Sequence, residues 1–165
     1  MPGPTATARI DSPIGVIAIA ATPGCLTGIS ILPRQRGAAG VAGHALLEEA
    51  CEQLCAYFDG KLKRFDLPFA SAGTAEGDRM RAAILSIPFG QTNTYGTVAA
   101  RVQTSARAIG QACKANPFPI LVPCHRVISS SGAEYYSGGG GPRTKAWLND
   151  FEHDHLPSAQ RTRLI

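Results

Sequence analysis

Cys124 and His125 are adjacent in the run Pro-Ile-Leu-Val-Pro-Cys-His-Arg-Val at residues 119–127. A thiolate is a strong nucleophile, and a neighbouring base or cation increases the thiolate fraction of a cysteine whose pKa lies near ~8.5. The apolar residues 120–122 predict a buried strand that holds the sulfur at its end. Successive side chains on a strand point to opposite faces, which argues against direct contact between thiol and imidazole. A buried structural cysteine is the alternative interpretation, and these residues alone favour it.

The composition is typical of a globular protein, with 165 residues of which 44% are hydrophobic and 17% charged. A formal net charge of +4 suits a surface that binds polyanions without demonstrating one. No apolar run of about 18 residues predicts a transmembrane helix. Residues 1–9 lack the basic start and apolar block of a secretory signal, so we expect a cytoplasmic protein.

The five cysteines do not follow the spacing of a structural metal site. Cys51 and Cys55 lie four residues apart on a predicted helix, and Cys113 falls on the apolar face of another, which is typical of core packing. No Cys-x-x-Cys pair occurs, so we predict no metal, with a site of scattered ligands as the alternative.

The first part of the chain predicts a small sheet and one helix. Apolar runs at 14–21 and 26–32 flank a Pro-Gly dipeptide, which is typical of a β-hairpin. Apolar residues at helical spacing predict a helix over 44–59 that ends at Gly60. A linker at 70–74 would close an N-terminal domain over residues 1–74.

The second part is predicted to be mainly helical, with one domain over residues 75–155 and a loose tail over 156–165. A helix that Pro88 ends comes first. Thr94 can cap a short helix that runs to about residue 101, and a three-residue connection leads to a helix over 105–114. Two short helices joined in this way predict a helix-turn-helix, and a last helix follows over 143–155.

The helix over 105–114 carries a basic stripe, because Arg107, Gln111 and Lys114 fall at i, i+4 and i+7. Ala106 and Gly110 are small enough to let the helix lie close to another surface. A DNA groove is one such surface, and a solvated amphipathic helix is the alternative.

Taken together, the chain resembles the O6-alkylguanine-DNA alkyltransferases, also called methylated-DNA–protein-cysteine methyltransferases, along nearly its whole length. The most specific stretch is the pentapeptide Pro-Cys-His-Arg-Val at 123–127, preceded by Asn-Pro-Phe-Pro-Ile at 116–120. The other matching stretches, in chain order, are 12–15, 53–54, 57–60, 65–68, 87–92, 95–96 and 107–110. The resemblance implies an α/β (α+β) fold. A small ribonuclease-H-like sheet-and-helix domain would precede a winged helix-turn-helix domain that carries the active site.

The same resemblance implies irreversible, single-turnover transfer of an alkyl group from O6-alkylguanine in DNA to Cys124, with O4-alkylthymine as a further candidate substrate. His125 would act as a base through a bridging water, and Glu152 would orient it. Asn116 would brace the turn that carries Cys124. No cofactor is implied.

For the substrate, the resemblance implies a flipped base that receives hydrogen bonds from Tyr95 and Ser137, in a pocket that Tyr136 and Val127 complete. Arg107 would enter the duplex in place of the extruded nucleotide. Ala106 and Gly110 would let the helix press into the minor groove of double-stranded DNA. Gln111, Lys114 and Thr94 would make further DNA contacts, and a monomer is expected.

The sequence departs from the family pattern in three places. Tyr135 precedes Tyr136 where the family has glycine or asparagine, and a run of four glycines follows at 138–141. The connection at 102–104 is short and lacks glycine or proline, and the usual aromatic residues are absent around 77–81.

Three other functions remain as alternatives. The first is a relative that binds lesions without repairing them, although such relatives lack the acceptor cysteine. The second is a thiol hydrolase that uses Cys124, His125 and Glu152. The third is a transcription regulator with Cys124 as its sensor.

Overall fold

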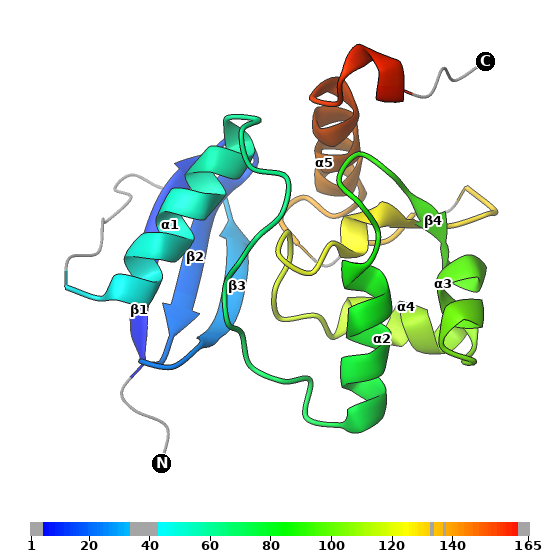
Figure 1. Cartoon of the computed structure of the whole chain (residues 1–165), viewed down its shortest axis with the longest axis horizontal. Helices are drawn as coiled ribbons and strands as arrows, with labels where there is room; N and C mark the ends of the chain where they lie inside the picture. The colour runs from blue at the N-terminus through cyan, green and yellow to red at the C-terminus, as the bar shows by residue number, and fades with distance from the viewer. Residues whose placement is uncertain (1–4, 34–42, 133, 137, 162–165) are drawn as a thin grey trace. The chain divides into compact units, whose positions relative to one another are not determined.

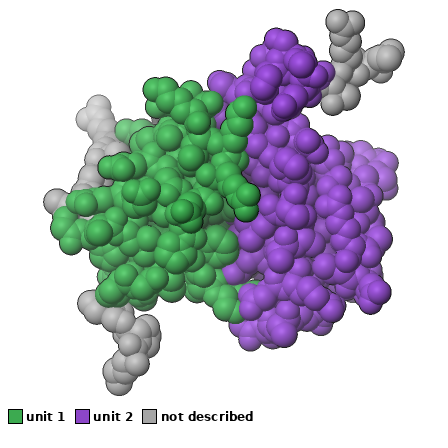
Figure 2. All heavy atoms as spheres, viewed as in Figure 1, with its two compact units in different colours: residues 1–72, 117–121 green, residues 73–116, 122–165 purple. Residues whose placement is uncertain are grey.

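The computed structural model describes residues 5–33, 43–132, 134–136 and 138–161 (Figure 1). The chain forms two compact units (Figure 2): unit 1 comprises 1–72 and 117–121, and unit 2 comprises 73–116 and 122–165. The predicted domains, 1–74 and 75–155, differ from these units at the boundary, in the segment 117–121 and in the residues after 155, which are counted with unit 2. The segment 117–121 was predicted within the helical domain, but it packs within unit 1.

Unit 1 is an antiparallel sheet in the order β1-β2-β3 with helix α1 across it (Figure 1). The three strands are β1 (Ala6–Ser12), β2 (Gly15–Ala21) and β3 (Leu26–Leu32), and the helix is α1 (Ala45–Phe58). The predicted hairpin is confirmed as β2 and β3. The core consists of the buried side chains of β2 and of the inward face of α1, among them Ile17, Ile19, Leu47, Leu54 and Tyr57.

Strand β1 was not predicted, because it has no apolar run. Its fully buried side chains are the small residues Ala8 and Ser12, and Ile10 on the same face is half-buried. The turn into β2 fixes it instead: the Ser12 hydroxyl donates to the Gly15 carbonyl at 2.7 Å. Gly15 has φ +123°, and a Cβ there would overlap the Leu32 carbonyl, so this turn requires glycine.

The run at 120–122 is buried, but it is not a strand, so that prediction is wrong. Pro119 and Pro123 lack the N–H groups that a ladder needs. Ile120 has φ +78°, which is incompatible with a strand and rare for a β-branched residue. The chain before this bend is held by a hydrogen bond from the Ile29 N–H to the Pro117 carbonyl at 2.8 Å.

Unit 2 is mainly helical, with one short parallel strand pair, β4 and β5. Its elements are α2 (Ala75–Leu85), β4 (Asn93–Thr94), α3 (Tyr95–Arg101), α4 (Ala106–Lys114), the 3-10 turn η1 (Cys124–Arg126), β5 (Val127–Ile128), α5 (Pro142–Asp154) and the 3-10 turn η2 (Ser158–Gln160). The core of unit 2 includes Ile84, Val98, Ile109 and Leu148. The predicted mixed α/β class, a small sheet unit followed by a helical one, is confirmed.

Helices α3 and α4 pack together and form the predicted helix-turn-helix. Thr94 and Ser105 cap them, since each hydroxyl accepts from the backbone N–H three residues on, at 3.2 and 3.0 Å. Gln103 in the connection has φ +54°, a conformation that usually falls to glycine. The connection therefore forms the turn without a glycine, and Gln103 carries some backbone strain.

The tail begins as part of unit 2. Leu156 is buried, and the Arg161 guanidinium donates to the carbonyls of Leu156 and Asp154 at 3.1 and 2.7 Å. The described portion, 156–161, therefore contacts the end of α5. Across the described residues, no helix is long and apolar enough to cross a membrane.

Candidate active site

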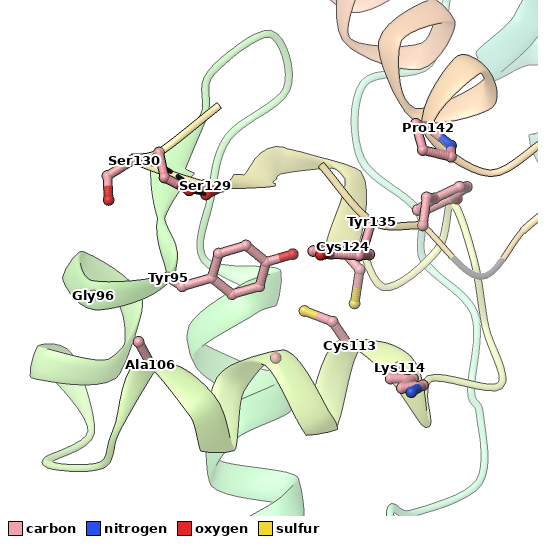
Figure 3. Close-up of a pocket in the computed structure, with 13 residues that line it drawn as sticks. Tyr95, Gly96, Ala106, Cys113, Lys114, Cys124, Ser129, Ser130, Tyr135 and Pro142 are labelled. Atoms are coloured by element: carbon pink, nitrogen blue, oxygen red, sulfur yellow. Dashed lines mark hydrogen bonds between the residues drawn. The ribbon is translucent and has the colours of Figure 1, made fainter. Parts of the chain in front are cut away.

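A pocket of about 840 Å³ opens in unit 2 beside helix α4 (Figure 3). The beginning of α3, one face of α4, Cys124 and the loop after β5 form its walls. The residues that line it are Tyr95, Gly96, Ala106, Gly110, Cys113, Lys114, Cys124, Ser129, Ser130, Ser131, Tyr135, Tyr136 and Pro142. The pocket therefore joins the predicted nucleophile to the predicted DNA-binding helix.

Cys124 begins η1 and is only 5% exposed. The Asn116 amide donates to the Cys124 sulfur at 3.3 Å and to the Val122 carbonyl at 3.1 Å, so it braces the turn. A hydrogen bond with the Cys113 thiol and burial raise the pKa of Cys124 well above its usual 9.0, although the Asn116 amide opposes them. Cys124 is thus a protonated thiol at rest and needs a base to become a nucleophile.

His125 is fully buried and is paired with Glu152 on α5: its Nε2 lies 2.7 Å from Glu152 Oε2. The Asn149 amide donates to the His125 carbonyl at 2.8 Å and ties η1 to the same helix. Among the described residues, the other ring nitrogen, Nδ1, is buried with no hydrogen-bond partner. One side of the imidazole is therefore fixed, and the other is available to a proton.

Arg126 holds the same carboxylate from the other side. Its Nε donates to Glu152 Oε1 at 2.8 Å, its Nη2 to Oε2 at 3.0 Å and its Nη1 to the Ile87 carbonyl at 2.7 Å. The Gly90 N–H adds a hydrogen bond to Glu152 Oε1 at 3.1 Å. This bidentate arrangement is the strongest geometry for an arginine–carboxylate pair.

These contacts set the protonation states. Burial alone would raise the pKa of Glu152, but His125 and Arg126 together hold it well below its usual 4.5. Burial lowers the pKa of His125 below its usual 6.5 despite the adjacent carboxylate. At neutral pH the site therefore combines a neutral imidazole with a carboxylate, and the permanent charge of Arg126 keeps that carboxylate ionised.

Two tyrosines face the pocket with their phenols protonated. Burial raises the pKa of Tyr95 to about 12, and burial also raises the pKa of Tyr136. The buried Tyr136 hydroxyl has no hydrogen-bond partner within the described parts of the chain. Unpaired buried hydroxyls are costly, so this group is available to a ligand that can pair with it.

The loop over the pocket is fastened to α5 by an ion pair that the sequence pattern did not predict. Lys145 Nζ lies 2.6 Å from Glu134 Oε2 and donates to the Tyr135 carbonyl at 3.3 Å. The Ser129 N–H donates to Glu134 Oε1 at 2.9 Å, so one carboxylate closes the loop and joins it to the helix. The Lys145 side chain is 2% exposed, and its ammonium lies 5.5 Å from the centre of the Tyr95 ring.

The predicted DNA-binding residues of α4 lie on its outward side. Arg107, Gln111, Lys114 and Ala106 are exposed and Gly110 is half-buried, whereas Ile109 and Cys113 of the same helix are buried.

Thr94 and Val127 make structural contacts in addition to the DNA and substrate contacts predicted for them. The Thr94 hydroxyl is engaged in the cap of α3, where it bonds Thr97. Val127 is fully buried in β5, pairs with Asn93 and is not part of the pocket wall as described. Ser137 lies outside the described residues.

Sequence reasoning missed Arg126, Cys113, Glu134 and Lys145. Arg126 lies inside the specific pentapeptide, and that position was the available signal. Cys113 was assigned to core packing, yet it also lines the pocket. No group of three or more His, Cys, Asp and Glu side chains in the described residues has the arrangement of a metal site.

Comparison with known proteins gives the same result along both units. The family model for the 6-O-methylguanine DNA methyltransferase ribonuclease-like domain matches residues 7–71, and the model for the DNA binding domain of the same family matches 77–154. A methylated-DNA–protein-cysteine methyltransferase of Mycobacterium leprae is 37% identical over 154 residues, covering 90% of this chain and 93% of the relative. The protein of the same name from Methanosarcina mazei is 40% identical over 153 residues, covering 89% and 96%.

Solved structures agree. The crystal structure of Mycobacterium tuberculosis O6-methylguanine methyltransferase superposes with a TM-score of 0.78 at 34% identity, covering 94% of this chain and 96% of that one. The Mycobacterium tuberculosis OGT structure in complex with DNA gives a TM-score of 0.76 at 36% identity, covering 92% and 94%.

Proposed function

Because the chain belongs to the 6-O-methylguanine DNA methyltransferase family, we propose that it repairs DNA by moving an alkyl group from O6-alkylguanine to Cys124. The observation that carries the proposal is the buried Cys124 thiol, which lies in a pocket bordered by α4 and next in sequence to the His125–Glu152 pair. A thiol alone would suit many reactions. A thiol with a buried base, beside a helix with a basic outer stripe, suits chemistry on a base that has left the DNA stack.

In the proposed reaction, the Cys124 proton passes through a bridging water to His125 Nδ1, the ring nitrogen that has no partner in the described structure. The neutral imidazole can accept this proton, and Glu152 then stabilises the imidazolium through its 2.7 Å contact with Nε2. The thiolate attacks the alkyl carbon, an S–C bond forms and the C–O6 bond breaks. Glu152 does not touch the substrate, so its role is to position and stabilise His125.

The departing guanine takes the electron pair of the broken bond and needs a proton. Tyr95 and Tyr136 are supported as donors by their place in the pocket wall and by phenols that stay protonated at neutral pH. Ser137 completes this proposed set through the family resemblance. The product on the protein is a thioether, which nothing in this site would hydrolyse, so each molecule reacts once.

For DNA, we propose that α4 enters the minor groove of the duplex and that Arg107 replaces the extruded nucleotide. Ala106 and Gly110 offer the close approach that this needs, and Gln111 and Lys114 are exposed beside them. DNA affinity should then fall as salt rises, since phosphate contacts release counterions. We propose that a monomer acts without a cofactor.

A titration with excess duplex containing O6-methylguanine tests this proposal. The amount of repaired guanine should saturate at about one per protein, because the acceptor is consumed. Cys124→Ala should bind the duplex nearly as well as the unaltered protein and repair none of it.

The alternatives give different results in the same assay. Lesion-selective binding by the unaltered protein, without repair, would support the lesion-binding alternative. Repeated turnover would support a hydrolase instead.

A further inference from the structure

The pocket contains a second thiol, which the proposed transfer does not use. Cys113 lies near the end of α4, and Figure 3 shows its sulfur and that of Cys124 in the same part of the pocket, beside α4. Both residues are less than a tenth exposed, both are free cysteines, and their sulfurs are hydrogen-bonded to each other. Alkyl transfer uses one thiol, so the second thiol in this pocket has no role in the proposed transfer.

We propose that Cys113 and Cys124 are a dithiol that a small hydroperoxide converts to an intramolecular disulfide, which reversibly blocks the alkyl acceptor. The assignment of the pair rests on the shared pocket and the interaction between the two thiols, whereas its effect on repair rests on the function proposed above.

The two segments that carry these sulfurs are already tied together. Asn116, two residues beyond the end of α4, donates to the Cys124 sulfur at 3.3 Å and to the Val122 carbonyl at 3.1 Å. A disulfide needs an S–S separation of about 2.05 Å, so hydrogen-bonded sulfurs held on braced segments have only a short distance to close. The Asn116 brace therefore holds the end of α4 beside the turn that carries Cys124.

The hydrogen bond also shifts the pKa values of the two thiols in opposite directions. The hydrogen bond from Cys124 lowers the pKa of Cys113, and the nearby Lys145 ammonium adds to this effect against the opposing effect of burial. The same hydrogen bond raises the pKa of Cys124. Cys113 is therefore the better thiolate of the resting pair, and thiolates are the form that peroxides oxidise.

The reaction balances without a cofactor. The Cys113 thiolate attacks the peroxide, whose O–O bond breaks, and gives a sulfenic acid and, from hydrogen peroxide, hydroxide. The Cys124 sulfur then attacks that sulfenic sulfur, the S–S bond forms and water leaves with the Cys124 proton. Both sulfurs are oxidised by two electrons in total, and the peroxide is reduced. A dithiol reductant returns both thiols by exchange.

Two of the three remaining cysteines make a matched control. Cys51 and Cys55 lie on α1 in unit 1, and burial raises the pKa of both thiols. They lie outside the pocket wall described above. Their replacement should leave the proposed disulfide unaffected.

The experiment treats the reduced protein with a small excess of hydrogen peroxide, blocks remaining thiols with iodoacetamide and maps peptides by mass spectrometry. We expect one linked peptide pair, Cys113 with Cys124, and a loss of about 2 Da in the unblocked intact mass. Transfer from an O6-methylguanine duplex should be lost with the same time course and should return after dithiothreitol. Cys113→Ser should give no link and should lose transfer activity to peroxide more slowly, because the thiolate that the peroxide oxidises is absent. The double variant Cys51→Ser/Cys55→Ser should behave like the unaltered protein.

Two results would overturn the proposal. One is a sulfinic acid on Cys124 while Cys113 stays a free thiol that iodoacetamide alkylates, and the other is a link that involves any other cysteine. The two proposals fail separately. A protein that repairs when reduced but never links refutes the dithiol, whereas one that links but never repairs refutes the proposed function.

Discussion

Replacing Glu152 by glutamine tests the buried network that supports His125. Each carboxylate oxygen of Glu152 faces two groups: Oε1 lies at 2.8 and 3.1 Å from Arg126 Nε and the Gly90 N–H, and Oε2 at 2.7 and 3.0 Å from His125 Nε2 and Arg126 Nη2. The amide NH₂ of glutamine must replace one of these oxygens. In either orientation it meets an N–H of Arg126, and the guanidinium loses its counter-charge.

The expected cost is large because the pair is shielded from water. The side chains of Arg126 and Glu152 are 8% and 1% exposed, so the weak energetics of surface ion pairs do not apply. Breaking a buried pair by removing one partner costs about 3–5 kcal/mol. For a chain of this length that corresponds to a fall of about 6–20 °C in the melting temperature of the protein.

Urea and thermal unfolding of Glu152→Gln measure this, with Asp154→Asn as the control on the same helix. Asp154 lies 3.8 Å from His153 in a pair whose side chains are 74% and 38% exposed, so its replacement should change stability by less than about 0.5 kcal/mol. The double variant Arg126→Met/Glu152→Gln should recover part of the loss, because it removes the unpaired charge. A loss below about 1 kcal/mol for Glu152→Gln alone would refute a dry, buried network.

The same network predicts how stability depends on pH. The folded pKa of His125 lies below its usual 6.5, so the unfolded chain binds a proton there that the folded chain does not, and stability falls as pH drops below 6.5. The folded pKa of Glu152 lies well below its usual 4.5, so its contribution is complete above 4.5 and is lost as pH falls further. The stability difference between the unaltered protein and Glu152→Gln should therefore shrink in acid. A difference that stays constant from pH 7 to strong acid would contradict the assignment.

Three further changes test other parts of the molecule. Arg107→Ala should slow transfer from duplex O6-methylguanine more than reaction with free O6-benzylguanine, and equal slowing in both assays would remove its role in flipping. Gln103→Gly should raise the free energy of unfolding by about 0.5–1 kcal/mol, because glycine adopts φ +54° without the strain that Gln103 has. Urea titration measures this change, and a lower free energy of unfolding would contradict the prediction. Glu134→Ala should leave the buried Lys145 ammonium without its 2.6 Å partner, cost about 1–2 kcal/mol and slow transfer. Glu134→Gln should keep the hydrogen bond from the Ser129 N–H and should lose less stability than Glu134→Ala. Equal losses in the two variants would argue against a role of Glu134 in closing the loop.

Local signals in the sequence predicted the local structure well. Thr94 caps the helix that follows, and the Pro-Gly turn joins two strands, because these effects depend on residues within one turn of each other. Hydrophobic periodicity gave a wrong element where backbone conformation, rather than side-chain burial, determines the structure. Ile120 lies in an apolar run between two prolines, and the bend at φ +78° that places Cys124 on a turn has no signature in hydrophobicity.

The site was predicted as a set of residues, and the network that joins them was not. Arg126 and Glu152 are 26 residues apart, and no pattern within either segment indicates that a guanidinium shares the carboxylate with His125. The same holds for Glu134 and Lys145, whose ion pair exists only once the loop and α5 lie together. Cys113 is similar, because its place on the inward face of α4 suits core packing as well as a pocket wall.

The central claim is that the Cys124 sulfur, rather than any other thiol, accepts the alkyl group. Intact-mass spectrometry after incubation with an O6-methylguanine duplex, followed by peptide mapping, tests it directly, because Cys113 shares the pocket and is the strongest competing acceptor. We predict one added methyl group per protein, located on Cys124 and absent from Cys124→Ala. A methyl group on Cys113, or methylation that persists in Cys124→Ala, would contradict the account.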